Sequence, residues 1–136
     1  MQKILLFTVL LMFSSLAKSQ DTIKATFISI NKYATTIDNL LLQMNSSIKA
    51  DRHTEIHQQL TDIKTALLSI ETELQYLPDE YYNSFAPVVA SFKTEADEFE
   101  KLTLKKSFLD KDKRIIAKKL SLEQIDEVLK LKLPKH

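Results

Sequence analysis

Residues 56–77 read IHQQLTDIKTALLSIETELQYL and hold the most regular apolar pattern in the 136-residue chain. Aliphatic residues recur there at alternating steps of four and three, which places them along one side of an α-helix. Such a seam is typical of a helix packed nearly parallel or antiparallel to its neighbours. We expect Asp51 or Thr54 to cap the start of this helix and Pro78 to end it. The seam consists of Ile56, Leu60, Ile63, Leu67, Ile70, Leu74 and Leu77.

The preceding residues predict a first helix from Asp21, whose carboxylate can cap the free amides of the first turn, to about Lys49. Its opposite faces differ in polarity, as expected for a helix at the surface of a core. The polar face carries Lys24, Lys32, Asp38 and Asn45. The apolar residues are Ile23, Phe27, Ile30, Ala34, Ile37, Leu40, Leu41, Met44 and Ile48.

Residues 78–84 predict either a connector or a short helix. We expect Ser84 to cap a third helix, in which Pro87 is tolerated because it falls in the first turn. This helix is expected to fade between residues 105 and 108. Its inward face consists of Phe85, Val88, Val89, Phe92, Ala96, Phe99 and Leu102.

A last helix is predicted to begin near Asp110 or Asp112 and to stop at Pro134. Ser121 and Gln124 match a capping box, so a break at Ser121 is an alternative. One continuous helix is favoured, because apolar residues recur on both sides of Ser121. These residues are Ile115, Ile116, Leu120, Ile125, Val128, Leu129 and Leu131.

Four amphipathic helices with short connections predict an all-α fold, an up-down-up-down antiparallel four-helix bundle in a single domain of residues 20–136. The charges agree with this arrangement. Residues 51–100 contain 3 basic and 11 acidic side chains, whereas residues 101–136 contain 11 basic and 5 acidic ones. We expect these two segments to lie side by side.

The first 19 residues predict a cleaved signal peptide. An apolar run follows Lys3, and the small residues Ala17 and Ser19 lie three and one positions before the expected cleavage site at Gln20. The run is too short to span a bilayer, which takes roughly 20 residues, so we expect no stable membrane insertion. Export without any cysteine favours a periplasmic or secreted bacterial protein over a disulfide-stapled one.

Composition excludes several classes of function. The chain contains no glycine, and phosphate loops, dinucleotide-binding turns and nucleophile elbows all depend on glycine. After cleavage, 17 basic and 18 acidic residues remain, which implies neither nucleic acid nor anionic lipid as a partner. We therefore expect a protein that is not an enzyme, whose partner is an unknown envelope protein or a small apolar ligand.

Two histidines are weak candidates for metal ligands. His53 and His57 lie four residues apart, so both imidazoles could reach one metal ion from a helix. The favoured interpretation is that both are solvent-exposed, because they fall in the first turn of their helix.

Charged and aromatic groups also have structural interpretations. We expect the carboxylates to lie on solvated faces: Asp79, Glu80, Glu95, Asp97, Glu98 and Glu100. A basic run could bind phosphates, but compensation by the acidic half is favoured for Lys111, Lys113, Arg114, Lys118 and Lys119. One aromatic cluster would form either the lip of a pocket or, as favoured, a plug at one end of the bundle: Tyr76, Tyr81, Tyr82 and Phe85.

The first helical hairpin resembles that of the soluble periplasmic b-type cytochromes of the four-helix-bundle kind. The likeness runs through Ile37, Leu40, Met44, Lys49-Ala50-Asp51, Leu60-Thr61, Ile63-Lys64 and Ala66 to Leu68. Phe92, Phe99 and Asp110-Lys111-Asp112 are similar to the second half of that family. The resemblance implies a periplasmic bundle with haem b held between a methionine and a histidine.

In the register of this resemblance, the haem-ligand positions fall on Ile37 and Leu129, which cannot bind iron. Met44, two turns beyond Ile37 on the same face, is a conceivable substitute. We therefore expect a cytochrome-like scaffold without haem or another cofactor, acting by binding or by structural interaction. The alternative is a haem-binding electron-transfer protein that uses non-standard ligands.

Overall fold

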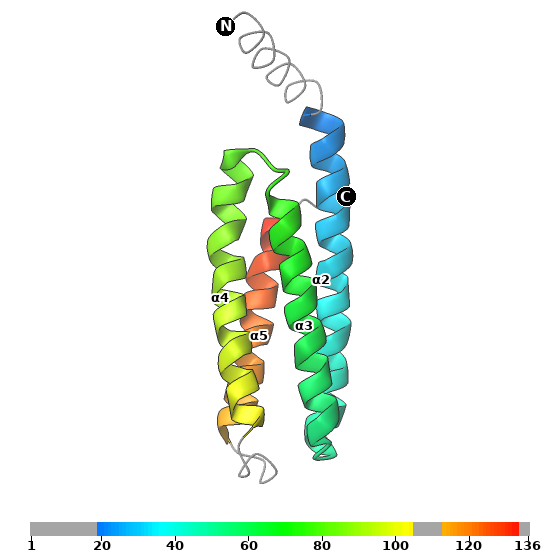
Figure 1. The fold of residues 1–136 in the computed structure, drawn as a ribbon, viewed down its shortest axis with the longest axis vertical. Helices are drawn as coiled ribbons and strands as arrows, with labels where there is room; N and C mark the ends of the chain where they lie inside the picture. Colours follow the sequence, from blue (N-terminus) through cyan, green and yellow to red (C-terminus); the bar gives the residue numbers. More distant parts are fainter. Residues whose placement is uncertain (1–18, 105–112, 134–136) are drawn as a thin grey trace, which may run out of the picture.

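The computed structural model describes residues 19–104 and 113–133, which form four α-helices. These are α2 (Ser19–Lys49), α3 (His53–Leu74), α4 (Asp79–Thr103) and α5 (Lys113–Lys132). Figure 1 shows the helices side by side, running alternately up and down. The predicted all-α, up-down-up-down bundle is confirmed. The predicted signal peptide falls almost entirely on residues outside the described ranges.

The helices form a ring in which each helix packs on the next along the chain, and α2 packs on α5 to close it. The contact between α2 and α3 is the most extensive of these four interfaces, and the contact between α2 and α5 is the sparsest. The two ends of the described chain therefore meet at the least tightly packed side of the bundle.

The core follows the predicted seams in the first three helices. All seven seam residues of the 56–77 segment are buried, and four of them have no exposed surface. On α4, Phe85, Phe92 and Phe99 recur every seven residues and are 0–1% exposed. Ile37 and Met44 of α2 are fully buried against them in the same core cluster.

The turn between α2 and α3 shows how a chain without glycine ends a helix. Asp51 has a positive φ of 54°, a conformation that aspartate tolerates better than most residues. The amide of Arg52 donates to Ser47 O over 2.9 Å, and the amide of Asp51 donates to Ile48 O over 3.2 Å. This is the Schellman pattern, with aspartate at the position that usually holds glycine.

Several predicted helix starts differ from the structure. Serine at position 19 already belongs to α2, so Asp21 lies in the first turn rather than at the cap. Arg52 is the N-cap of α3 and makes no side-chain capping bond, so neither Asp51 nor Thr54 has that role. The reason is the Schellman turn, which ends one residue after Asp51. The N-cap position therefore falls on Arg52, and α3 begins at His53.

The start of α4 also differs from the prediction. Residues 79–84 are helical, with Pro78 as N-cap, so Ser84 lies inside the helix and Pro87 lies well beyond its first turn. Pro78 has a φ of −57°, already suited to a helix start, and Asp79 and Glu80 place negative charge at the helix N-terminus. These two effects start the helix earlier than the apolar pattern alone suggests.

Helix α5 is continuous through Ser121, as favoured. The buried positions are Ile115, Leu122, Asp126, Leu129 and Leu133. Of the other apolar residues of the predicted helix, four are 44–76% exposed: Ile116, Leu120, Val128 and Leu131. The buried residues Ile115, Leu122 and Leu129 recur every seven residues. Asp126 lies four residues after Leu122 and three before Leu129, so its carboxyl group is on the same core-facing side.

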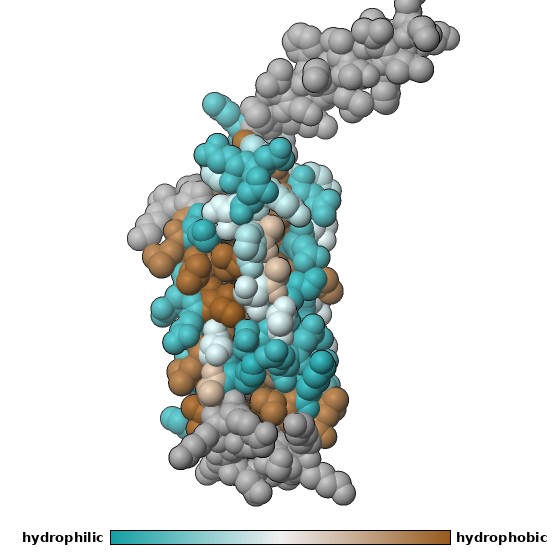
Figure 2. Space-filling model, turned by 90° about the vertical axis from the view of Figure 1, so that its left-hand side faces the viewer, coloured by the Kyte–Doolittle hydropathy of each residue, from teal (hydrophilic) through white to brown (hydrophobic). Residues whose placement is uncertain are grey.

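The surface of the bundle is therefore not uniformly polar. Figure 2, which views the molecule from the side of α4, shows brown apolar side chains among teal polar ones. Despite these groups, none of the described helices combines the length and apolar character needed to cross a membrane.

Candidate functional site

The groove between α2 and α5 is the candidate site. It forms an open cavity of about 400 Å³, a volume within the range of small-molecule sites. Seven residues line this groove: Asp38, Leu41 and Leu42 of α2, and Glu123, Asp126, Glu127 and Lys130 of α5. We call these residues the α2–α5 groove. Its position matches the sparsest helix contact in the ring.

Asp126 is the most unusual residue of the α2–α5 groove. It is only 3% exposed, although it is an acidic residue on a short bundle helix. Its Oδ2 lies 3.3 Å from Nζ of Lys130, one turn further along α5, and its Oδ1 has no hydrogen-bond donor among the described residues. A buried carboxylate oxygen without a donor costs free energy.

Asp38 faces this carboxyl group from α2. Nζ of Lys130 lies 2.8 Å from Asp38 Oδ1, so the lysine bridges carboxyl groups of two helices. The short ion pair does not have the geometry of a hydrogen bond to Asp38 Oδ1. Each carboxyl group of the pair therefore keeps one oxygen without a donor while both are ionised.

A proton resolves this arrangement. Burial is the main cause that raises the pKa of Asp126 to about 8, followed by the hydrogen bond and the charge of Asp38, while Lys130 acts in the opposite direction. Asp126 is therefore largely protonated at neutral pH and can donate to Asp38. The pKa of Lys130 is also raised, chiefly by its contact with Asp38, so the ammonium group stays charged.

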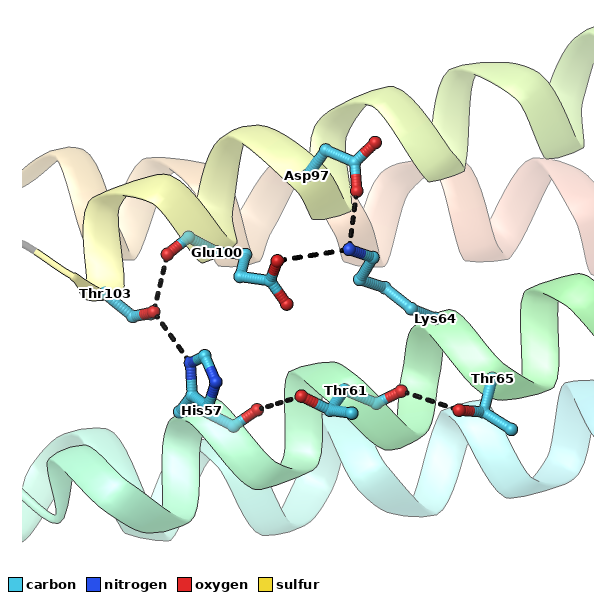
Figure 3. A network of polar contacts seen from close by, with 7 residues as sticks. All are labelled: His57, Thr61, Lys64, Thr65, Asp97, Glu100 and Thr103. Atoms are coloured by element: carbon cyan, nitrogen blue, oxygen red, sulfur yellow. Dashed lines mark hydrogen bonds and ion pairs between the residues drawn. The ribbon is translucent and has the colours of Figure 1, made fainter.

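A second polar cluster joins α3 to α4 (Figure 3). Nζ of Lys64 lies 2.7 Å from Asp97 and 3.2 Å from Glu100. The Thr103 hydroxyl donates to Glu100 O over 2.6 Å and lies 3.2 Å from Nδ1 of His57. The pKa of Lys64 is raised, mainly by its hydrogen bond to Asp97. This cluster links two helices, and its acidic groups stay in contact with water.

The predicted metal ligands lie beside this cluster. His53 and His57 are both partly buried, so the solvent-exposed interpretation was wrong, and the contact of His57 with Thr103 explains its burial. Among residues 19–104 and 113–133, no group of three or more suitable side chains could hold a metal ion.

The predicted haem-facing positions all lie in the core. Ile37, Met44 and Leu129 have no exposed surface. Ile37 directly precedes Asp38, and Leu129 directly precedes Lys130. Two of the three predicted haem-facing positions are therefore immediate sequence neighbours of charged residues in the α2–α5 groove.

The structure describes two side chains of the predicted basic run, Lys118 and Lys119. Lys118 contacts Glu95 and Glu98 of α4, which confirms compensation by the acidic half for this lysine. Lys119 instead contacts Glu123 of its own helix and Asn45 of α2. Of the other basic residues, Lys111 and the side chains of Lys113 and Arg114 lie outside the described part.

The aromatic cluster fits the plug better than the lip of a pocket. The ring of Tyr81 meets Phe27 edge-on at 5.2 Å, and Phe27 lies 6.0 Å from the buried Phe85. These contacts join the starts of α2 and α4. Tyr76 is 62% exposed and lies outside this packing.

Sequence reasoning missed the α2–α5 groove because Asp38 was assigned to a solvated face and Asp126 was assigned no role. One signal was present: Asp126 falls in the four-and-three register that connects Ile115, Leu122 and Leu129, four residues before Lys130. No protein-family model, curated protein or solved structure matches this chain.

Proposed function

We propose that this chain is an exported, non-enzymatic helical bundle that acts in the bacterial envelope by binding, with the α2–α5 groove as its binding site. The observation that carries this proposal is Asp126, a 3% exposed carboxyl group at the wall of a cavity. Burying such a group opposes folding, and strongly perturbed acids in clefts are often found at functional sites.

Export is supported by the first 19 residues. The basic start, the short apolar run and the small residues before Gln20 fit a signal peptidase site. Intact mass of the protein recovered from its native envelope tests this part of the proposal. The mature chain is expected to begin at or near Gln20, whereas Met1 retained on a membrane-bound product would contradict it.

Binding is favoured over catalysis by the chemistry of the described groove. Its lining consists of carboxyl groups, one ammonium group and two leucines, with no serine, threonine, cysteine or histidine among the lining residues. The absence of glycine from the chain argues against the common phosphate-binding and nucleophile loops.

The proposal includes a cytochrome-like scaffold that holds no haem. The aliphatic side chains of Ile37 and Leu129 cannot supply axial ligands, and the adjacent groove is lined by four acidic residues that disfavour the carboxylate groups of haem. The second candidate is a haem carrier. The observation in its favour is Met44, whose thioether is buried on the same face as Ile37.

Haem titration separates these two functions. We expect weak binding and a broad spectrum, because no strong ligand pair spans the core. Combined Ile37→Met and Leu129→His substitutions are expected to sharpen the reduced bands if the inferred register is right. Sharp reduced bands in the unmodified protein, abolished by Met44→Ala, would establish the haem carrier instead.

Binding in the groove is tested by methyl NMR with six-carbon probes of different charge: hexanol, hexanoate and hexylammonium. At least one probe is expected to shift the methyl signals of Leu41 and Leu42 saturably. Leu68 is the matched control, since it is a 53% exposed leucine on α3 outside the groove. If no probe shifts the groove signals, the groove is not a binding site for small molecules and the proposal fails.

A further inference from the structure

The α2–α5 groove has a strong imbalance of ionisable groups. Four acidic side chains line it, Asp38, Glu123, Asp126 and Glu127, together with the ammonium group of Lys130, and Lys119 contacts Glu123 from outside the lining. Such a lining repels anions and attracts cations. The charge of any ligand is therefore restricted by the residues that surround the cavity.

Acidic residues alone do not define a site, but Asp126 adds an independent observation. Its buried Oδ1 has no hydrogen-bond donor among the described residues, and the residue lines the cavity. This atom has almost no solvent-accessible surface in the free protein, so a ligand's donor reaches it only by displacing Lys130. Buried polar atoms are generally paired, and in the free protein the proton that Asp126 shares with Asp38 meets this need. A cationic ligand that brings its own donors can replace that proton.

Lys130 indicates what kind of donor fits. Its ammonium group lies between the two aspartates, 2.8 Å from Asp38 and 3.3 Å from Asp126. The lysine side chain is 44% exposed and has a flexible stem. It can therefore withdraw into water and leave the space between the aspartates to another cation.

The apolar part of the lining lies on α2. Leu41 is 4% exposed and packs into the core, whereas Leu42 is 65% exposed. Exposed leucine beside a cavity gains free energy when an apolar chain covers it, at roughly 25 cal/mol for each Å² removed from water. The groove thus combines a cation-binding end with an apolar surface.

We propose that the α2–α5 groove binds an organic ammonium ion with a short apolar chain, whose head group lies between Asp38 and Asp126 and whose chain covers Leu41 and Leu42. This inference rests on the proposed binding function and names its ligand class. The ligand replaces Lys130 between the aspartates. A cavity of about 400 Å³ is large enough for such a molecule.

Binding of a cation is linked to proton release. The groups that face Asp126 are Asp38 from α2 and Glu123, Glu127 and Lys130 from its own helix. An ammonium ion beside Asp126 favours its ionised form, so the complex releases the proton that burial retains in the free protein. Affinity is therefore expected to rise as the pH increases from about 6 to about 9, while the amine stays charged.

The test compares hexylammonium with hexanol and hexanoate on the full mature chain, by methyl NMR titration and by calorimetry in buffers that differ in ionisation enthalpy. Hexylammonium is expected to bind at least about tenfold more tightly than hexanol, which corresponds to about 1.4 kcal/mol. Calorimetry at neutral pH should detect proton release.

Variants assign the effect to the groove. Asp38→Asn and Asp126→Asn are each expected to weaken hexylammonium binding by about tenfold, whereas Lys130→Met should strengthen it by removing a competing ammonium group. Glu98→Gln is the matched control, because Glu98 contacts Lys118 between α4 and α5 outside the groove. Circular dichroism verifies that each variant is folded.

Four outcomes overturn the inference. Equal affinity for hexanol and hexylammonium would show that the groove recognises the apolar chain alone, and the binding function would stand without the ammonium. Unchanged hexylammonium affinity in Asp38→Asn and Asp126→Asn would place the cation elsewhere. Saturable binding of Ca²⁺ or Mg²⁺ that excludes hexylammonium would assign the groove to a metal. If no probe binds at all, the proposed function fails with it.

Discussion

Two interfaces of this bundle contain the same three charged groups, one lysine between two carboxylates, and use them differently. Between α3 and α4, Lys64 contacts Asp97 and Glu100, whose side chains are 54% and 30% exposed. Between α2 and α5, Lys130 contacts Asp38 and Asp126, whose side chains are 31% and 4% exposed. The main difference is the burial of one carboxyl group.

This burial distinguishes the exposed ion pairs of the α3–α4 interface from the candidate site at the α2–α5 interface. At the α3–α4 interface both acids keep contact with water, so neither depends on its lysine for solvation. At the α2–α5 interface, Asp126 has lost most of its water and its Oδ1 gains no donor in exchange. The same composition therefore gives a weak link between helices in one place and a buried acid at the wall of a cavity in the other.

Leucine truncation should produce the largest difference between tight and loose interfaces. Leu67 has no exposed surface in the seam of α3, so Leu67→Ala is expected to lower the free energy of unfolding by roughly 2 to 5 kcal/mol. Chemical denaturation measures this loss. Thr65→Ala, at an exposed position of the same helix, should stay within about 0.5 kcal/mol.

Truncation of Leu41 tests whether packing is looser beside the cavity than in the seam of α3. Leu41 lines the α2–α5 groove, so Leu41→Ala removes fewer packing contacts and should cost less than Leu67→Ala. If the Leu41 variant lost more stability than the Leu67 variant, the α2–α5 interface would be as tightly packed as the others.

Replacing the buried acid should stabilise the protein. Above the raised pKa of Asp126, Asp126→Leu removes an ionised, desolvated carboxylate and leaves the pair of Asp38 and Lys130 in place. Exchange of buried ionic groups for apolar ones is often neutral or stabilising by about 1 to 4 kcal/mol, and we expect a gain within that range at about pH 9.

The matched change at the other interface is Asp97→Leu, which replaces a half-exposed acid. It should alter stability by no more than about 0.5 kcal/mol. Equal effects of the two substitutions would remove the distinction between the interfaces, and a loss of stability in Asp126→Leu would indicate that the carboxyl group is well solvated.

The next prediction is the pH dependence of stability that the titration of Asp126 produces. Its pKa is raised from 3.8 to about 8 on folding, so the folded protein retains a proton that the unfolded chain releases. This stabilisation is complete below about pH 4 and is lost as the pH rises through about 8. The loss is at most about 1.4 kcal/mol for each pH unit.

Comparison with Asp126→Asn isolates this contribution. The difference in unfolding free energy between the unmodified protein and the variant should decline from about pH 4 to about 8 and then level off. A difference that stays constant, or that grows with pH, would contradict the raised pKa.

The fold could be predicted from sequence because a single physical signal, apolar spacing, was strong in three helices. The 56–77 seam packs as its spacing indicates, and Lys49 ends the first helix as expected. Helix starts were less accurate, since Arg52 and Pro78 lack the side-chain capping bonds on which the predictions relied. Backbone geometry and helix charge determined these boundaries instead.

The groove could not be predicted in the same way. On α5, exposed apolar residues such as Leu131 hide the spacing of the buried residues in the sequence. Asp126 is acidic, so a search for apolar residues does not identify it as buried. Its partner Asp38 lies on another helix, 88 residues earlier in the chain. Only the packing of α2 against α5 brings the two carboxyl groups together.

The smallest expected effect is at the α3–α4 interface, where Lys64→Met tests whether the exposed ion pairs contribute to stability. The raised pKa of Lys64 reflects its contacts with Asp97 and Glu100, but its side chain is 32% exposed and the solvated acids do not require it. Pairs of this type contribute about 0 to 1 kcal/mol, so the loss should lie within that range and shrink in high salt. A double-mutant cycle with Asp97→Asn should give a coupling energy of similar size. A loss above about 2 kcal/mol that persists in high salt would show that Lys64 is energetically essential, and the contrast with the α2–α5 groove would then rest on Asp126 alone.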